Sequence, residues 1–409
     1  MFGYTRILIV VLALLAVVSG YNYLFHPFAS WTNIDATQMN QNSVSPSPSP
    51  EPVDPLVELI EKLSPEQKIA QLISLPLTLP TVSSNSANLT KPLDDQQIGL
   101  LTLLRPGFVL IYGEKINFDQ VSAAIEQINQ VFSQTEFKPA IMVDHEGGSV
   151  QRLGGEGFTR LPSWRSYCQL PLGEREELLA ESARELSSAG INIVLAPVLD
   201  VATQSSVLKD RVCSGDPMQV AQAGAEFVRI FQSYQILPVL KHYPGIGSIT
   251  KDLHTSFDTR AVKENDLLVF DLILDKYSRL GVMSGHMGTA PLNPDIPCSL
   301  SPDCLNILST THPRTLVFSD DLLMESARYN ATSQKYDKLL GQVVQEAVKA
   351  GNQVLIFGKN AEPEEIIEVQ TALMELYNQE EGAALIDTRL KAVFEYKNLQ
   401  SSEEQTNAD

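Results

Sequence analysis

Basic residues and cysteines are scarce in this 409-residue chain. It contains 30 Lys and Arg against 49 Asp and Glu, so its formal net charge is −19 and its pI is about 4.7. Nucleic-acid binding needs a basic face for the phosphates, and we therefore expect no nucleic-acid partner. The few Cys and His residues show no Cys-x-x-Cys or His-x-x-x-His spacing. We therefore expect no metal site, and no cofactor.

The cysteines are Cys168, Cys213, Cys298 and Cys304. An even number permits disulfides in an exported protein. Cys298 and Cys304 are close enough in sequence for a local loop, and Cys168 could pair with Cys213 across loops. The spacing does not decide between these pairings and free buried thiols.

The first 33 residues have the pattern of a targeting segment. Arg6 precedes an apolar run, Ile7 to Val18, which Ser19 and Gly20 follow. A cleavable signal peptide fits this pattern, and so does an uncleaved anchor. An extension to Phe25 would give roughly 19 residues, just long enough to span a bilayer, and its aromatic residues favour the anchor. We therefore expect a membrane-anchored or secreted protein on the extracytoplasmic side of a bacterial membrane.

A spacer separates this segment from the globular part. Residues 34–55 are rich in Asn, Gln, Ser and Pro, with Ser-Pro repeats from Ser45 to Pro50, and such a composition is typical of an extended linker. We expect one globular domain over residues 56–398, and the 44% apolar composition of the whole chain is sufficient for a large core. The polar residues 399–409 are expected to be disordered.

Short apolar runs alternate with helical patterns through the globular part. The expected parallel strands cover residues 71–76, 108–112, 140–144, 191–195, 237–242, 282–286, 315–320 and 354–357. Helix starts are expected at Ser64, where Gln67 completes a capping box, and at Asp216. Asp387 is expected to cap a last helix that ends near Tyr396. This alternation predicts an α/β fold, a (β/α)8 TIM-type barrel forming a single catalytic domain.

Several of these runs end at a polar or ionisable side chain. Asp144, Lys241, His242 and Asp320 all stand at expected strand ends. A TIM-type barrel builds its active site at the carboxyl ends of its strands. The sequence therefore predicts an enzyme whose chemistry involves Asp320.

A second pattern supplies a candidate proton donor. The glycine-rich stretch Lys241–Gly247 is followed by Asp252 and His254, which are separated by one residue. A carboxylate beside an imidazole favours the imidazolium and fixes its tautomer. This pair predicts general acid–base catalysis by His254.

Several motifs, in the same order, resemble one enzyme family. These are Asp144–Gly148, Phe158–Pro162, Ala196–Asp200, Lys241–Gly247 with Asp252–His254, and Ser319–Leu322. Over roughly residues 64–397 the chain resembles the single-domain bacterial β-N-acetylhexosaminidases of glycoside hydrolase family 3. That family's pattern reads Asp-Gln-Glu-Gly-Gly, Lys-His-Phe-Pro-Gly-His-Gly and Asp-Ser-His at three of these places.

The resemblance implies roles for matching residues. Asp320 matches the nucleophile that forms a covalent glycosyl-enzyme, while its neighbour Asp321 is expected to cap a helix. His254 matches the general acid/base, with Asp252 as its partner. The side chains that match sugar-binding positions are Asp144, Arg152, Arg211, Lys241 and His242. His286 is expected either to support the site or to touch the sugar, and Asp200 to be structural.

Four departures from the family pattern bear on the site. Ile246 stands where a second His is usual, Ser248 where Asp is usual, and Ser149 where Arg is usual. Leu253 separates Asp252 from His254, where the family has Ser. These changes bear on the packing and mobility of the loop that carries His254, and on the preferred leaving group.

The resemblance implies an exo-acting, retaining β-N-acetylglucosaminidase that removes terminal N-acetylhexosamine from cell-wall-type glycans. A β-glucosidase or β-xylosidase of the same family is an alternative, although the Asp-His pair favours the amino-sugar branch. A catalytically weak glycan-binding wall module is a third interpretation, which the changes at Ile246 and Ser248 support. We expect a monomer whose partners are an N-acetylglucosamine-containing glycan and, through the N-terminal segment, a membrane.

Overall fold

The structure is a computed structural model that describes residues 54–81, 91–135 and 137–397. The described residues all belong to one unit, Val53–Asp409. The expected targeting segment 1–33, the linker as far as residue 53 and the tail 399–409 lie outside them. Among the described residues, no helix has both the length and the apolar character needed to cross a membrane.

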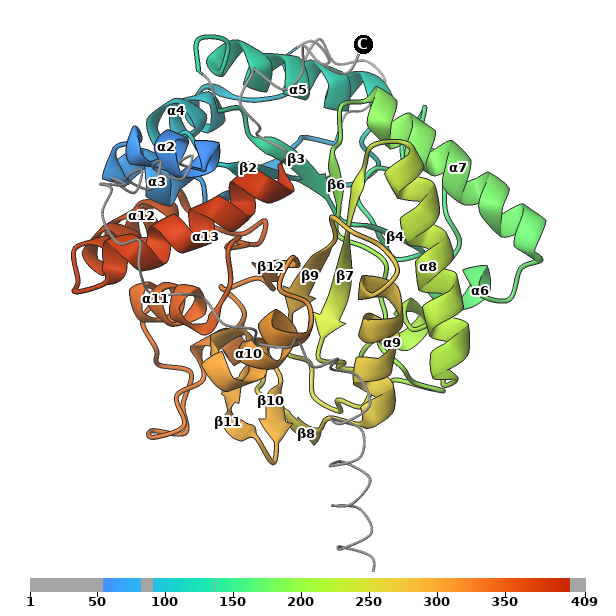
Figure 1. The fold of residues 1–409 in the computed structure, drawn as a ribbon. Helices are drawn as coiled ribbons and strands as arrows, with labels where there is room; N and C mark the ends of the chain where they lie inside the picture. The colour runs from blue at the N-terminus through green and yellow to red at the C-terminus, as the bar shows by residue number, and fades with distance from the viewer. Residues whose placement is uncertain (1–53, 82–90, 136, 398–409) are drawn as a thin grey trace, which may run out of the picture. The chain divides into compact units, whose positions relative to one another are not determined.

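A curled sheet of parallel strands forms the centre of the domain (Figure 1). Its seven strands lie in the order β1-β2-β3-β6-β7-β9-β12, and every neighbouring pair is parallel. The strands are β1 (Ser74–Thr78), β2 (Phe108–Tyr112), β3 (Ala140–Val143), β6 (Ile193–Val194), β7 (Leu237–Tyr243), β9 (Gly281–Ser284) and β12 (Leu316–Ser319). Each overlaps one of the first seven expected strands. Because both faces of these strands are covered, each reads in the sequence as a continuous apolar run.

The eighth expected strand, 354–357, is present only as isolated bridges between the two edges of the sheet. Val354 bridges Phe318 of β12, and Leu355 bridges Ile73, which precedes β1. The Ser74 amide donates to the Leu355 carbonyl at 3.0 Å. The two edge strands are therefore linked through this short segment.

Helices lie around the outside of the strands (Figure 1). They are α2 (Pro55–Glu61), α3 (Pro65–Ala70), α4 (Asp95–Leu104), α5 (Phe118–Val131), α6 (Trp164–Tyr167), α7 (Leu172–Ser188), α8 (Pro217–Ser233), α9 (Glu264–Leu274), α10 (Pro302–Thr311), α11 (Leu340–Ala350), α12 (Pro363–Tyr377) and α13 (Gly382–Tyr396). Three short 3-10 helices lie between these elements among the described residues: η2 (Lys209–Arg211), η3 (Cys298–Leu300) and η4 (Glu325–Arg328).

Two of the three expected helix starts are confirmed, and one is wrong. Ser64 and Gln67 form a reciprocal capping box, and the Asp216 carboxylate accepts the Met218 amide. Asp387 does not cap a helix, because α13 begins earlier, at Gly382. Its carboxylate instead forms an ion pair with Lys68 of α3 at 2.9 Å.

Short strands that the sequence did not predict lie beyond the main sheet. The hairpin of β4 (His145–Gly147) and β5 (Val150–Gln151) directly follows β3. A three-stranded sheet contains β8 (Thr259–Ala261), β10 (Gly288–Ala290) and β11 (Asn293–Pro297). Both elements follow carboxyl ends of the central strands, where the polar side chains of the sequence motifs also stand.

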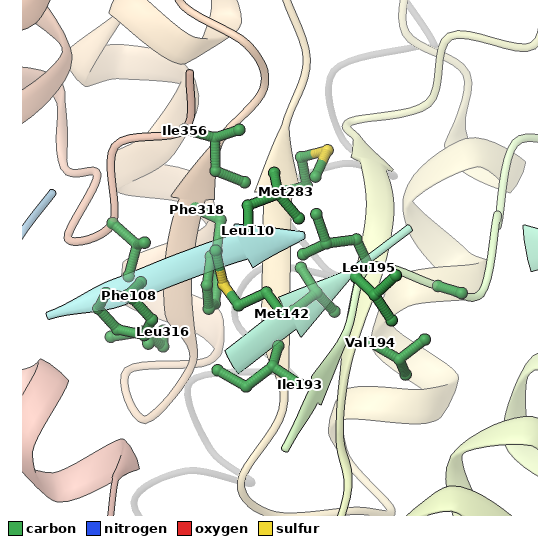
Figure 2. Close-up of a cluster of buried hydrophobic side chains, with 14 of the residues drawn as sticks. Phe108, Leu110, Met142, Ile193, Val194, Leu195, Met283, Leu316, Phe318 and Ile356 are labelled. Carbon is green, nitrogen blue, oxygen red and sulfur yellow. The ribbon is translucent and has the colours of Figure 1, made fainter. Parts of the chain in front are cut away.

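The interior of the curled sheet is filled with apolar side chains (Figure 2). Phe108, Met142 and Phe318 are fully buried, and the rings of Phe108 and Phe318 meet edge to face with centroids 6.0 Å apart. Phe108 and Phe318 come from β2 and β12, which are far apart in the order of strands. The sheet therefore encloses a packed core rather than a channel, and a polar cavity opens at its carboxyl end.

Both cysteine pairs form disulfides. Cys168 bonds Cys213, and Cys298 bonds Cys304. The first bond joins the end of α6 to the segment just after η2, which carries Arg211. The pairing that spacing alone left open is thereby assigned.

Candidate active site

A cavity of about 490 Å³ opens at the carboxyl ends of the central strands. Seven of the eight sequence-predicted site residues line it: Asp144, Arg152, Arg211, Lys241, His242, His254 and Asp320. The eighth, Asp252, lies beside His254. These residues come from four separate loops and strand ends, so the fold brings together groups that are far apart in the sequence.

Asp320 directly follows β12, and the sheet holds its backbone. Its amide donates to the Ser284 carbonyl of β9 at 3.0 Å, and its Oδ1 accepts the Asp321 amide at 2.8 Å. Burial raises the pKa of Asp320, but nearby His242 and His286 and the bond from Asp321 outweigh burial and leave that pKa below its usual value. The carboxylate is therefore charged at neutral pH at the wall of the cavity.

The neighbouring Asp321 has a different environment. Its Oδ1 accepts the amides of Leu323 and Gly358, each at 2.9 Å. Burial, together with the charge of Asp320, raises the pKa of Asp321 to about 6. This carboxyl group fixes the chain after β12. The expectation that it caps a helix is wrong, because the next helical element, η4, begins at Glu325 and has Met324 at its N-cap.

His254 and Asp252 form a pair on an exposed loop after β7. Asp252 Oδ1 lies 2.9 Å from His254 Nδ1 and also accepts the His254 amide at 3.0 Å. Burial raises the pKa of Asp252, but its bonds to His254 outweigh this and lower it. Because Nδ1 faces Asp252, Nε2 is the nitrogen able to exchange a proton with a substrate. The side chain of His254 is 68% exposed, so it can be reached from the cavity mouth.

A buried ion-pair network holds the cations of the site. Lys241 Nζ lies 2.9 Å from Asp144 Oδ1 and 2.6 Å from Glu146 Oε1. Arg211 makes a two-point contact with Glu146, Nε to Oε2 at 2.8 Å and a terminal nitrogen to Oε1 at 2.9 Å. Burial raises the pKa of Glu146, but Arg211 and Lys241 outweigh it and hold that pKa well below its usual value. Glu146 therefore positions both cations.

The charges of Lys241 and Arg211 are stabilised in return. Burial lowers the pKa of Lys241, but Asp144 and Glu146 raise it above its usual value. Burial also lowers the pKa of Arg211, and Glu146 reverses this effect. Both side chains are therefore positive donors at neutral pH, which suits the hydroxyl oxygens of a sugar.

His242 and Arg152 complete the wall. The Nδ1 atom of His242 lies 2.7 Å from Asp200 Oδ2, and Asp200 also accepts the Ile246 amide at 2.7 Å. Asp200 is fully buried and holds the start of the loop, which agrees with the structural role expected for it. The Arg152 guanidinium lies over the Tyr112 ring at 5.7 Å, with its Nε 4.0 Å from Asp144.

Two residues of the site were not fully predicted. Glu146 belongs to the Asp144–Gly148 motif, but no role was assigned to it, because its partner Arg211 is 65 residues away. His286 is buried and does not line the cavity. Its ring bridges Ser299 Oγ at 2.6 Å and the Asp321 carbonyl at 2.9 Å, so it supports the strand end that carries Asp320.

No group of three or more His, Cys, Asp and Glu side chains suited to a metal ion occurs among residues 54–81, 91–135 and 137–397. The Lys and Arg side chains that line the cavity are Lys241, Arg211, Arg152 and Lys359. The arrangement combines a charged carboxylate, an accessible imidazole and cationic hydrogen-bond donors around one cavity. Such a set is suited to cleavage of a glycosidic bond.

Comparison with known proteins agrees with this chemistry. The Glycosyl hydrolase family 3 N terminal domain matches residues 64–395. The chain belongs to this family, and it is a glycoside hydrolase, an enzyme that acts on O-glycosyl bonds.

Several relatives of the chain are named beta-hexosaminidase. That of Haemophilus ducreyi is 27% identical over 328 residues, which are 76% of this chain and 90% of the relative. That of Photobacterium profundum is 32% identical over 215 residues, or 50% of this chain and 63% of the relative. Beta-hexosaminidase LpqI of Mycobacterium tuberculosis is 34% identical over 200 residues, 45% of this chain and 50% of the relative.

Solved structures share the fold. A beta-N-acetylhexosaminidase from Beutenbergia cavernae superposes with a TM-score of 0.70 at 23% identity, covering 82% of this chain and 99% of its own. The M. tuberculosis LpqI structure gives 0.68 at 24% identity, covering 84% and 96%. At these identities the similarity shows the fold alone.

Proposed function

We propose that the protein is an exo-acting, retaining β-N-acetylglucosaminidase that removes terminal N-acetylhexosamine from cell-wall-type glycans. The observation that carries the proposal is the ionised Asp320 in the wall of a cavity that His254 also lines. The names of the relatives, beta-hexosaminidase, support the choice of an amino sugar.

In the first step the carboxylate of Asp320 attacks the anomeric carbon, and a glycosyl ester forms. At the same time His254, protonated at Nε2, gives its proton to the departing glycosidic oxygen, and the aglycone leaves as an alcohol. Asp252 at Nδ1 stabilises the imidazolium before transfer.

In the second step the neutral imidazole of His254 takes a proton from water. The resulting hydroxide equivalent attacks the anomeric carbon, breaks its bond to Asp320 and restores both groups. Two displacements at one carbon retain its configuration. An imidazole in this role places no second anion beside the nucleophile.

Side chains in the walls of the cavity bind the sugar. Lys241 and Arg211 donate to sugar oxygens, and Asp144 accepts from hydroxyl groups while Arg152 donates beside it. Because Glu146 already balances the two inner cations, a neutral sugar is a suitable ligand for this site.

The proposal also covers the closure of the barrel and the location of the protein in the cell. We infer that Val354 and Leu355 act as the eighth strand of a closed (β/α)8 barrel, since each makes a parallel bridge to one edge of the sheet. We also infer a monomer that works on the extracytoplasmic side, held or exported by its N-terminal segment.

The test is a panel of 4-nitrophenyl glycosides assayed with the full chain and with Asp320→Asn. The N-acetyl-β-glucosaminide should be the best substrate, and Asp320→Asn should lower its kcat by at least about 10³-fold. Preference for the glucoside or xyloside would favour the alternative enzymes. If the protein binds N-acetylglucosamine but turns over none of the glycosides, that result would instead support a glycan-binding module.

A further inference from the structure

A small apolar cluster lies apart from the main core, beneath the loops of the cavity mouth. We call it the rim cluster; it consists of Leu208, Val212, Ile246, Ile249, Leu253, Met287 and Met324. Each of these side chains is at most 6% exposed. Its side chains come from four different loops, those that follow β6, β7, β9 and β12.

Three of the four loops of the rim cluster carry a residue that lines the cavity. Val212 directly follows Arg211, and Leu253 directly precedes His254. Met324 follows Asp320 within the same loop after β12 and itself lines the cavity. The cluster therefore ties the loop of the proton donor to the loop of a sugar-binding cation and to the loop of the nucleophile.

Two members of the rim cluster stand where the chain departs from the family pattern. Ile246 replaces a His and Leu253 replaces a Ser, and both are now buried, at 4% and 3% exposure. Polar side chains at these two places would have to find hydrogen-bond partners in an apolar pocket. The two departures thus belong to one feature, an apolar anchor under the loop of His254.

Backbone hydrogen bonds fix the same loop from the side of the nucleophile. The Glu325 amide donates to the His254 carbonyl, and the Ser326 amide to the Leu253 carbonyl, each at 3.3 Å. The main chain around His254 is therefore held, while its imidazole remains exposed.

The far end of the loop is held by aromatic side chains. Phe257 stacks on Tyr329 with centroids 4.3 Å apart and an interplanar angle of 8°. The Phe257 amide donates to the hydroxyl of Tyr336 at 3.0 Å. Together with the rim cluster, these contacts leave the loop little freedom to swing as a unit.

We propose that Leu253 is a positioning residue, whose buried side chain keeps His254 at the mouth of the cavity so that proton transfer to the leaving group needs no separate closing of the loop. This inference rests on the proposed glycosidase function. Leu253 touches neither substrate nor the reacting atoms; it acts through the backbone of its neighbour.

The test compares two aryl N-acetyl-β-glucosaminides in the full chain. A 4-nitrophenyl leaving group departs with little protonation, whereas a 4-methylphenyl group needs the acid. His254→Ala, as the reference, should lose about 100-fold or more in kcat/KM on the methylphenyl substrate and far less on the nitrophenyl substrate. Leu253→Ser should show the same selective loss, about tenfold, and Leu253→Met should restore the wild-type ratio.

Leu308→Ser, in a buried position of α10 away from the cavity, is the matched control for lost stability. It should leave the ratio of the two substrates unchanged. Equal losses on both substrates in Leu253→Ser, or none, would overturn the positioning role. If that variant does not fold, Leu253→Val gives the same comparison with a smaller effect. A wild-type protein inactive on both substrates would refute the proposed function itself.

Discussion

The substitution Glu146→Gln removes the negative charge that Lys241 and Arg211 share. The Glu146 side chain is 2% exposed, so the charges it balances are desolvated. Breaking a buried ion pair by removing one partner costs about 3–5 kcal/mol, because the other charge stays buried. Lys241 keeps Asp144 at 2.9 Å, so we expect the lower end of this range.

The same change should weaken sugar binding. Without its two-point contact to Glu146, the Arg211 guanidinium loses its fixed orientation at the cavity wall. We expect KM for an aryl N-acetyl-β-glucosaminide to rise about tenfold, equivalent to roughly 1.4 kcal/mol, with a smaller change in kcat. Denaturant unfolding followed by circular dichroism gives the stability, and steady-state kinetics gives KM.

Two controls separate the causes. Glu176→Gln breaks an exposed pair with Arg229, at 44% and 52% exposure, and should cost at most about 1 kcal/mol. Glu226→Gln breaks a buried pair with Arg175 outside the cavity lining, and should lower stability without raising KM. If Glu146→Gln costs no more than the surface variant, or if Glu226→Gln raises KM equally, the reasoning is wrong.

Two other predictions concern stability. Replacing Cys168 and Cys213 by Ala opens a loop of 45 residues and should lower the free energy of unfolding by about 4 kcal/mol in denaturant titration. The same replacement of Cys298 and Cys304, whose separation is 6, should lower it by about 2 kcal/mol. A larger loss for the short loop would contradict the loop-entropy argument. Because the pKa of Asp321 is raised to about 6, protonation of this group contributes about 3 kcal/mol to the free energy of unfolding. This contribution is fully present below about pH 4 and is lost as the pH rises through 6. Asp321→Asn keeps the backbone bonds and should flatten the stability profile in that window, whereas an unchanged slope would show that this group does not titrate there.

The strands were predictable because the physics that forms them is local. A strand covered on both faces must be apolar throughout, so Phe108–Tyr112 was assigned with the bounds that the structure shows. The last expected strand is reduced to bridges at Val354 and Leu355, and no periodicity distinguishes a full ladder from two bridges. The cap assigned to Asp387 was wrong because its partner, Lys68, lies 319 residues away.

The site was predictable to a different degree. Strand-end positions placed Asp144, Lys241 and Asp320 at one edge of the sheet, and the structure puts all three around one cavity. The role of Glu146 depends on its contacts with Lys241 and Arg211, which are distant in the sequence and therefore could not be predicted from it. The burial of Leu253 likewise follows from other loops, so its contacts became evident only in three dimensions.

The most direct test of the whole account is covalent trapping of the glycosyl-enzyme. A 5-fluoro N-acetylglucosaminyl fluoride should react faster than its ester hydrolyses, and mass spectrometry of a protease digest then locates the sugar. A single added fluorosugar on the carboxylate of Asp320 is the result we expect. Label on another residue, or consumption of the reagent with no adduct, would contradict the assignment of the nucleophile.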